Sequence, residues 1–120
     1  MFLPLNHQKL DVYSVSRAFI LECYRLTKHL PSDEKFSMIS QIRRAALSVH
    51  LNIAEGSSRK SAPERKRYFE ISRGSIIEID AALDIANDLN YLQNYNTENL
   101  GTQLTKCFRL LTGLINQKQS

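Results

Sequence analysis

Four stretches of the sequence carry apolar residues at alternating intervals of three and four positions, and turn-forming residues separate them. This spacing puts the apolar side chains on one side of a helix, so each stretch predicts an amphipathic helix rather than a strand. Such a helix buries its apolar side against other helices. Four helices joined by short connections predict an all-α protein, an antiparallel up-down-up-down four-helix bundle.

Stop signals divide the chain into these helices. The first should run from about residue 8 to 29 and end at Pro31, and the second should start from a Ser32 or Asp33 cap and end at a left-handed Gly56. A capping box at 61–64 begins the third, and an asparagine-rich turn near 90–97 precedes the fourth. The expected core positions are Val12, Ser16, Phe19, Cys23, Leu26 and Leu30; Phe36, Ile39, Ile42, Ala46, Val49 and Ile53; Tyr68, Ser72, Ser75, Ile76, Ile79, Leu83 and Ala86; and Leu100, Leu104, Cys107, Phe108, Leu111, Leu114 and Ile115.

The length of 120 residues predicts one domain over the whole chain, 1–120. Cys23 and Cys107 form no Cys-x-x-Cys or Cys/His spacing, which favours two reduced core thiols over a disulfide or a zinc site. The sequence shows no secretory signal pattern and no apolar run near the ~20 residues needed to cross a bilayer. We therefore expect a cytoplasmic protein without a membrane partner.

The pattern of potential catalytic residues favours a non-enzymatic protein. His7, His29 and His50 are scattered, and the sequence has no Glu-x-x-His pair of the kind that di-iron bundles use. No Gly-rich phosphate loop is present, and no Ser/His/Asp or Cys/His arrangement can be argued from the spacings. We expect neither a metal nor a cofactor.

The second helix has a polar stripe on the side away from its apolar residues. Its members are Gln41, Arg44, Ser48, Asn52 and Glu55. A solvated face is the simpler interpretation, but amides, a small serine and single charges suit a hydrogen-bonded contact with another protein surface. This stripe is therefore a candidate self-association surface.

The third helix offers a matching position at Gly74 and Ser75. Glycine inside a helix costs about 1 kcal/mol relative to alanine, so close approach by another helix would explain it. If the second and third helices are antiparallel, residues near 45 lie level with residues near 76. This arrangement predicts an ion pair between Arg44 and Glu78.

The run QIRRAALSVHLNIAEGSSR followed by RGSIIEID resembles the four-helix-bundle family encoded in intervening sequences of bacterial 23S ribosomal RNA genes. The resemblance covers roughly residues 8 to 117, with Ser72 where the family usually has alanine. It implies a ring-shaped homopentamer, and one branch of the family comprises accessory proteins of diversity-generating retroelements, which bind a reverse transcriptase and nucleic acid. It does not imply a structural ribosomal protein. The family pattern maps onto Gln41, Arg44, Ser48, Asn52, Glu55, Gly56, Arg59, Gly74, Ser75 and Glu78.

Charge is unevenly distributed along the chain, although the net charge is only +4. Residues 43–73 contain eight cations against three acids, whereas residues 74–105 contain five acids and no cation. An up-down bundle would gather the first group at one end, as a surface for RNA or DNA. Solubility, end-to-end stacking and a scaffold for a protein partner are the alternatives. The candidate nucleic-acid-binding residues are Arg59, Lys60, Arg65, Lys66 and Arg67, with Arg73 as an extension and Lys9 and Lys118 nearby; the opposite end would carry Asp33, Glu34, Asp84, Asp88 and Glu98.

Overall fold

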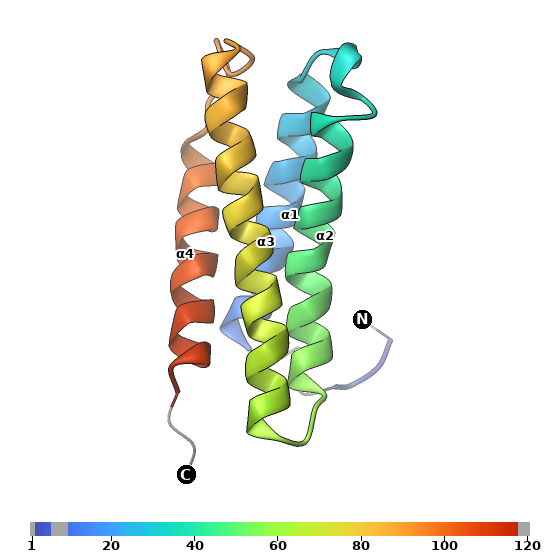
Figure 1. The fold of residues 1–120 in the computed structure, drawn as a ribbon, viewed down its shortest axis with the longest axis vertical. Coiled ribbons are helices and arrows are strands. Elements are labelled where there is room, and N and C mark those ends of the chain that lie inside the picture. The colour runs from blue at the N-terminus through green and yellow to red at the C-terminus, as the bar shows by residue number, and fades with distance from the viewer. Residues whose placement is uncertain (1, 6–9, 118–120) are drawn as a thin grey trace.

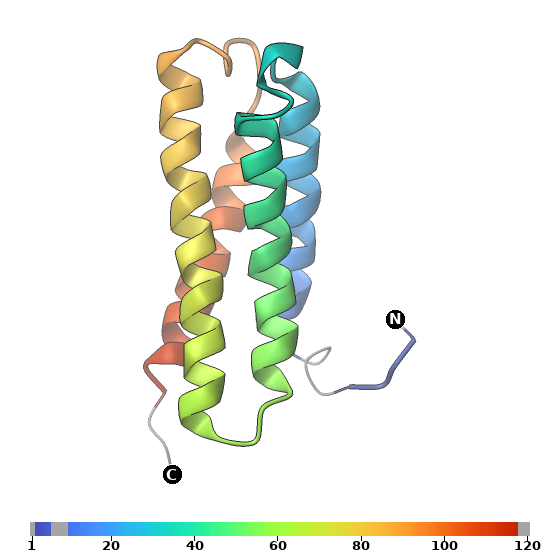
Figure 2. The same ribbon diagram turned by 45° about the vertical axis from the view of Figure 1, so that its right-hand side comes forward.

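Four helices run antiparallel to their neighbours in the computed structural model, which describes residues 2–5 and 10–117 (Figures 1 and 2). They are α1 (Asp11–His29), α2 (Met38–Ser57), α3 (Ala62–Asp88) and α4 (Glu98–Ile115), with a short 3₁₀ turn, η2 (Ser32–Glu34), between α1 and α2. The described residues contain no strand. The predicted all-α bundle is therefore confirmed.

Each helix packs against two others, α1 on α2, α2 on α3, α3 on α4 and α4 back on α1. Among the described residues, the backbones of helices that face each other diagonally do not come within 8 Å, measured between Cα atoms. The bundle is therefore four-sided, and each side is formed by two adjacent helices. The α2–α3 connection lies at the same end as the beginning of α1 and the end of α4 (Figure 1).

The core lies between the four predicted apolar stripes. On α1 the buried positions include Val12, Phe19, Cys23 and Leu26, as the spacing predicts. Corresponding stripes from α2, α3 and α4 complete it, with Ile42, Ala46, Val49, Ile53, Phe69, Ile76, Ile79, Leu100, Cys107 and Leu111 among the buried side chains. Burial of this apolar surface is the main force that holds the helices together.

The beginning of α2 differs from the prediction. Residues 32–34 form η2 instead of capping a continuous helix, and α2 begins only at Met38 after an irregular Ser37 (φ −127°, ψ −101°). Phe36 falls in this interruption and is 89% exposed, so its assignment to the core was wrong. The apolar spacing in the sequence continues through Phe36. The helix does not, because it is interrupted before Met38, and Phe36 is therefore not turned toward the core.

The end of α2 also differs from the prediction. Gly56 is a buried residue inside α2, and no glycine in the described residues has a positive φ. Its function is close packing: a Cβ at this position would lie 2.8 Å from Tyr68 Cβ and 3.3 Å from the Arg65 carbonyl oxygen on α3. The absent side chain lets α2 and α3 approach each other just before the turn.

The other two boundaries follow the predicted chemistry. Ser61 caps α3, and its hydroxyl accepts a hydrogen bond from the Glu64 amide at 3.2 Å. Between α3 and α4, Asn90 and Asn94 adopt positive φ values of 63° and 64°. Asparagine tolerates this left-handed conformation better than most residues, which explains its use in the turn.

Both cysteines are free and buried, as predicted. None of the helices in the described part of the chain is long and apolar enough to cross a membrane. Within the same residues, no group of three or more His, Cys, Asp or Glu side chains is arranged to hold a metal ion.

Candidate nucleic-acid and self-association surfaces

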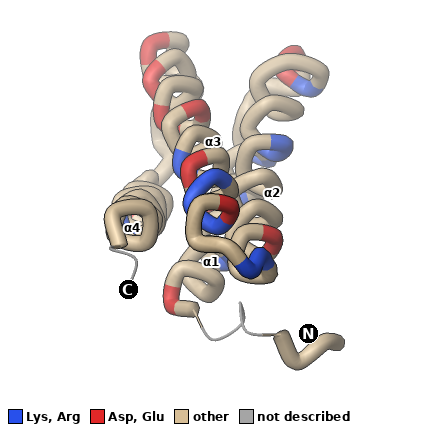
Figure 3. Tube along the Cα trace, turned by 60° about the horizontal axis from the view of Figure 1, so that its bottom comes forward, with Lys and Arg blue, Asp and Glu red and all other residues tan. Residues whose placement is uncertain are grey.

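The basic turn consists of Arg59, Lys60, Arg65, Lys66 and Arg67, where α2 turns into α3. All five cations lie within the connection or the first two turns of α3, and the cap at Ser61 fixes where that helix begins. In the view toward this end, Lys and Arg gather around the turn, and Asp and Glu dominate the far part of α3 (Figure 3). The predicted separation of charge along the bundle is thus present in α3.

Arg59 forms contacts within the turn itself. Its guanidinium pairs with Glu55, donates a hydrogen bond to the Tyr68 hydroxyl at 3.0 Å and stacks over the Tyr68 ring at 5.0 Å. Tyr68, followed by Glu55, raises the pKa of Arg59 above its ordinary value. Glu55, a member of the predicted polar stripe, therefore has a partner near the turn of its own chain.

Arg65 and Arg73 also have partners inside the protein. Arg65 Nη1 donates hydrogen bonds to the carbonyl oxygens of Arg59 (3.1 Å) and Lys60 (2.7 Å), which ties the turn to α3. Arg73 Nη1 donates to Thr112 Oγ1 at 3.2 Å and lies over the Phe108 ring, which joins α3 to α4. Arg65, a predicted nucleic-acid-binding residue, is thus engaged within its own chain.

Lys60, Lys66 and Arg67 are the unengaged cations of the basic turn. All three are exposed, and no hydrogen bond or ion pair joins their side chains to another residue in the described ranges. They can therefore contact a ligand without giving up an internal interaction. Lys9 and Lys118, which we expected nearby, lie outside the described residues.

The candidate self-association surface lies on the side of the bundle formed by α2 and α3. Ser75 Oγ donates a hydrogen bond to Ser48 Oγ (2.9 Å), and Asn52 Nδ2 donates to the Ser48 hydroxyl (3.0 Å) and carbonyl (2.8 Å). The Ser75–Ser48 bond thus joins α2 to α3 within one chain, whereas the Asn52 bonds lie within α2. Gln41, Arg44, Glu55, Gly74 and Glu78 are exposed around them.

Arg44 and Glu78 form no ion pair in the described part of the chain, so that prediction was wrong. The Ser48–Ser75 bond and the bond from Ser72 Oγ to the Val49 carbonyl (2.7 Å) place them level, as expected. Both side chains are nevertheless exposed, whereas their neighbour Ala45 is buried between the helices. The prediction placed Arg44 and Glu78 correctly at the same height along the bundle. It was wrong about the side of α2 from which Arg44 projects.

Gly74 has open space around it, in contrast to Gly56. No heavy atom of the described residues lies within 4 Å of the place where its Cβ would be, although it is in the middle of α3. Packing inside the chain therefore does not explain this glycine. The expected close approach of a helix would have to come from another molecule.

A family model for 23S rRNA-intervening sequence proteins matches residues 8–113. The chain belongs to this family. The match spans the basic turn and the α2/α3 side, and it confirms the family resemblance inferred from the sequence. A search of curated proteins gives no significant match.

Ser16 and His50 form a contact that the sequence of this family member did not reveal. Ser16 Oγ lies 2.7 Å from His50 Nδ1 and donates to the Tyr13 carbonyl at 2.9 Å. Because the hydroxyl has one hydrogen, donation to Tyr13 leaves Nδ1 as the donor in the other bond. Ser16 is fully buried, so this contact joins α1 to α2. Its partners are 34 residues apart, and no spacing rule could have found them.

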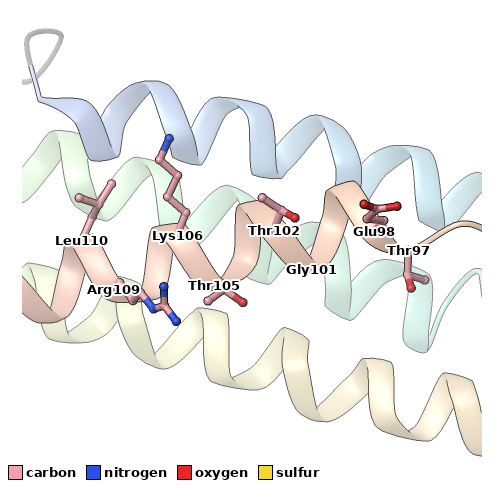
Figure 4. Close-up of a pocket in the computed structure, with 8 residues that line it drawn as sticks. All are labelled: Thr97, Glu98, Gly101, Thr102, Thr105, Lys106, Arg109 and Leu110. Atoms are coloured by element: carbon pink, nitrogen blue, oxygen red, sulfur yellow. The ribbon is translucent and has the colours of Figure 1, made fainter.

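The exposed side of α4 carries a surface depression whose lining includes none of the predicted nucleic-acid-binding or self-association residues (Figure 4). Gly101, Thr102 and Thr105 form its floor, Glu98 lies at one end, and Lys106 and Arg109 lie toward the other. None of these side chains hydrogen-bonds to another within the described residues. The depression thus differs from the basic turn, where the side chains form a connected network.

Proposed function

We propose that this protein is a non-enzymatic homo-oligomer that binds nucleic acid without sequence preference through the basic turn. The observation that carries this proposal is the set of three exposed cations, Lys60, Lys66 and Arg67, held at one end of the bundle without an acidic partner in the described part of the chain. Phosphate contacts from Lys and Arg supply affinity that does not depend on base sequence.

Arg59 and Arg65 support the proposal by fixing the shape of the turn. Their hydrogen bonds to Glu55, Tyr68 and the turn carbonyls hold the backbone that carries Lys60 and precedes Lys66 and Arg67. A fixed turn loses less conformational entropy on binding than a flexible one. Of the predicted residues, Arg73 is the least suited to bind nucleic acid, because its guanidinium is engaged with α4.

Self-association would strengthen the binding. The family resemblance favours a ring of five copies, each with its basic turn at the same end. Several weak contacts on one polymer combine through a high effective concentration, without any new contact. The α2/α3 side, with open space at Gly74, is the surface that we propose for this association.

A protein-interaction scaffold is the second candidate function, with a reverse transcriptase among the partners that the resemblance implies. The observation in its favour is the scarcity of aromatic side chains that could stack on bases. Tyr68 lies beside the basic turn, but its hydroxyl and ring are occupied by Arg59, and Phe69 is buried. Contacts to phosphate remain available, whereas base stacking does not.

The test is fluorescence anisotropy of labelled RNA and DNA oligomers with the wild type and a Lys60→Glu/Lys66→Glu/Arg67→Glu variant. Wild-type affinity should fall steeply between about 50 and 200 mM salt and vary little with base sequence. The variant should bind much more weakly, with a shallower salt dependence. Its helical circular dichroism and its oligomer mass should be unchanged, because the three side chains make no internal contact among the described residues.

A second triple variant controls for net charge. Lys28→Glu/Lys106→Glu/Arg109→Glu makes the same charge change at exposed positions away from the turn. Two results would contradict the proposal and favour the scaffold. One is that the wild type does not bind at the lower salt, and the other is that affinity falls equally in both triple variants.

A further inference from the structure

We propose that the groove between α3 and α4 binds an amphipathic helix of another protein, one that carries lysine or arginine beside its apolar side. This inference goes beyond the proposed function and does not depend on it, because the basic turn does not line the groove. It rests on three features of the groove, which are its apolar lining, the room left by small residues of α4 and the acidic residues of α3.

Two adjoining depressions along the α3/α4 side form the groove. The first is lined by Ile76, Ile77, Leu104 and Phe108, and Ile77 is 55% exposed. The second continues toward the α3–α4 connection, where Leu83, Leu92 and Leu100 line it. Asp80, Leu104 and Thr105 line both depressions, so the two are continuous. The groove therefore exposes apolar surface from two helices along its length.

Small residues of α4 leave room for a further helix. Gly101 and Thr105 lie one turn apart and both line the groove, and Thr105 points toward α3 (Figure 4). No heavy atom of the described residues lies within 4 Å of the place of a Gly101 Cβ, so another backbone can come close here. From Thr97 to Phe108, α4 advances about 17 Å at 1.5 Å per residue, the length of about three helical turns.

Acidic side chains border the apolar lining. Asp80 and Asp84 are exposed one turn apart on α3, and no hydrogen bond or ion pair joins their side chains to another residue in the described ranges. Carboxylates four residues apart on a helix repel each other, so helix stability does not account for this pair. Glu98 adds a third acid where α4 begins, beside Thr97 and Gly101. A cation at the edge of the groove would therefore meet unpaired carboxylates.

These charges indicate which occupant fits. No Lys or Arg is among the described residues that line the groove, and the guanidinium of Arg73, which lies over Phe108, is engaged with Thr112. Asp80 and Asp84 would repel nucleic acid or an anionic lipid surface. An amphipathic helix instead buries its apolar residues in such a groove, as many recognition helices do. Its lysines or arginines would then pair with Asp80 and Asp84.

The experiment measures the binding of fluorescein-labelled peptides to the full chain by anisotropy. The first peptide has about 18 residues, enough to form a helix, with leucines at helical spacing on one side and lysines on the other. The second has glutamates in place of the lysines. The third has the composition of the first in an order without helical periodicity. Only the first should bind, and its affinity should fall as salt increases.

Two variants test where the first peptide binds. Gly101→Trp fills the groove and Asp80→Lys/Asp84→Lys reverses its charge, and each should weaken binding about tenfold or more. Gly113→Trp is the control for the first, because it adds the same side chain to open space elsewhere on α4. Glu70→Lys/Asp88→Lys makes the charge change of the second at exposed positions of α3 outside the groove lining. Both controls should bind the peptide as the wild type does, and all variants should keep helical circular dichroism.

Four results would overturn the inference. They are a wild type that does not bind the lysine peptide, equal binding of the glutamate peptide, unchanged binding by Gly101→Trp, and a lower oligomer mass of Gly101→Trp, which would show that a second copy of the chain occupies the groove. The proposed function is tested separately, because Gly101→Trp should bind RNA as the wild type does. The Lys60→Glu/Lys66→Glu/Arg67→Glu variant should in turn bind the lysine peptide normally.

Discussion

Replacement of Gly56 by alanine tests why α2 and α3 lie so close before the basic turn. The new Cβ would be 2.8 Å from Tyr68 Cβ, 3.1 Å from Phe69 Cε1 and 3.3 Å from the Arg65 carbonyl oxygen. Carbon atoms pack best at about 3.5–4.0 Å. Tyr68 Cβ is bonded directly to the α3 backbone, so a side-chain rotation cannot remove the clash. We expect Gly56→Ala to push the two helices apart.

The magnitude follows from two opposing effects. Overpacking of a close contact lowers the free energy of unfolding by about 1–3 kcal/mol. Replacement of glycine by alanine inside a helix raises it by about 1 kcal/mol. Gly101→Ala should show the gain alone, because no atom of the described residues lies within 4 Å of the added Cβ and Gly101 is outside the surface proposed for self-association. The difference between the two variants therefore isolates the clash, and should be about 1–3 kcal/mol in the free energy of unfolding.

Urea unfolding followed by helical circular dichroism measures this difference. All proteins must be compared at one concentration, because association contributes to apparent stability. Gly113→Ala, with the same open space among the described residues and also in α4, serves as a second reference. Equal stabilisation by Gly56→Ala and Gly101→Ala would refute the reasoning, since it would mean that α3 accommodates the new methyl group without cost.

Two further predictions concern the core. Ser72→Ala removes the buried bond from Ser72 Oγ to the Val49 carbonyl and should lower the free energy of unfolding by about 1 kcal/mol in the same urea assay, and an unchanged midpoint would contradict this. Burial raises the pKa of Cys23 and of Cys107 from an ordinary 9.0 to about 12, so the stability that the protonated thiols contribute is present below pH 9 and is lost as the pH rises toward 12. At pH 8 both thiols should therefore react slowly with a thiol reagent in the folded protein and rapidly in urea, and equally fast labelling in both states would count against their burial.

Much of the fold could be predicted because local chemistry and periodicity agree. The spacing of apolar residues on α1 identified its buried side, Ser61 identified the beginning of α3, and the asparagines at 90 and 94 marked the turn before α4. Each of these features depends on residues within one or two helical turns. Such short-range information is fully contained in the sequence.

The errors arose where two helices meet. Gly56 looked like a left-handed cap, because a glycine near the end of a helix is also what a cap requires, but its partner is Tyr68 on α3. Arg65 was predicted only as a nucleic-acid-binding residue, but it donates hydrogen bonds to carbonyl groups of the preceding turn. Periodicity gives the side of a helix on which a residue lies. It does not give the direction of a neighbouring helix or the distance to it.

The basic turn offers a last prediction, because its charges can be tested for a role in stability. Lys60 lies between the end of α2, where a cation is favourable, and the beginning of α3, where it is unfavourable, so the two helix-dipole effects, each about 0.3–1 kcal/mol, largely cancel. Lys66 and Arg67 are exposed and unpaired among the described residues, and exposed charges of this kind contribute little to stability. Reversal of all three should therefore change the free energy of unfolding by less than about 1 kcal/mol while it weakens nucleic-acid binding. If the triple variant loses several kcal/mol in urea unfolding, these cations stabilise the fold, and the argument that they are free for phosphate fails.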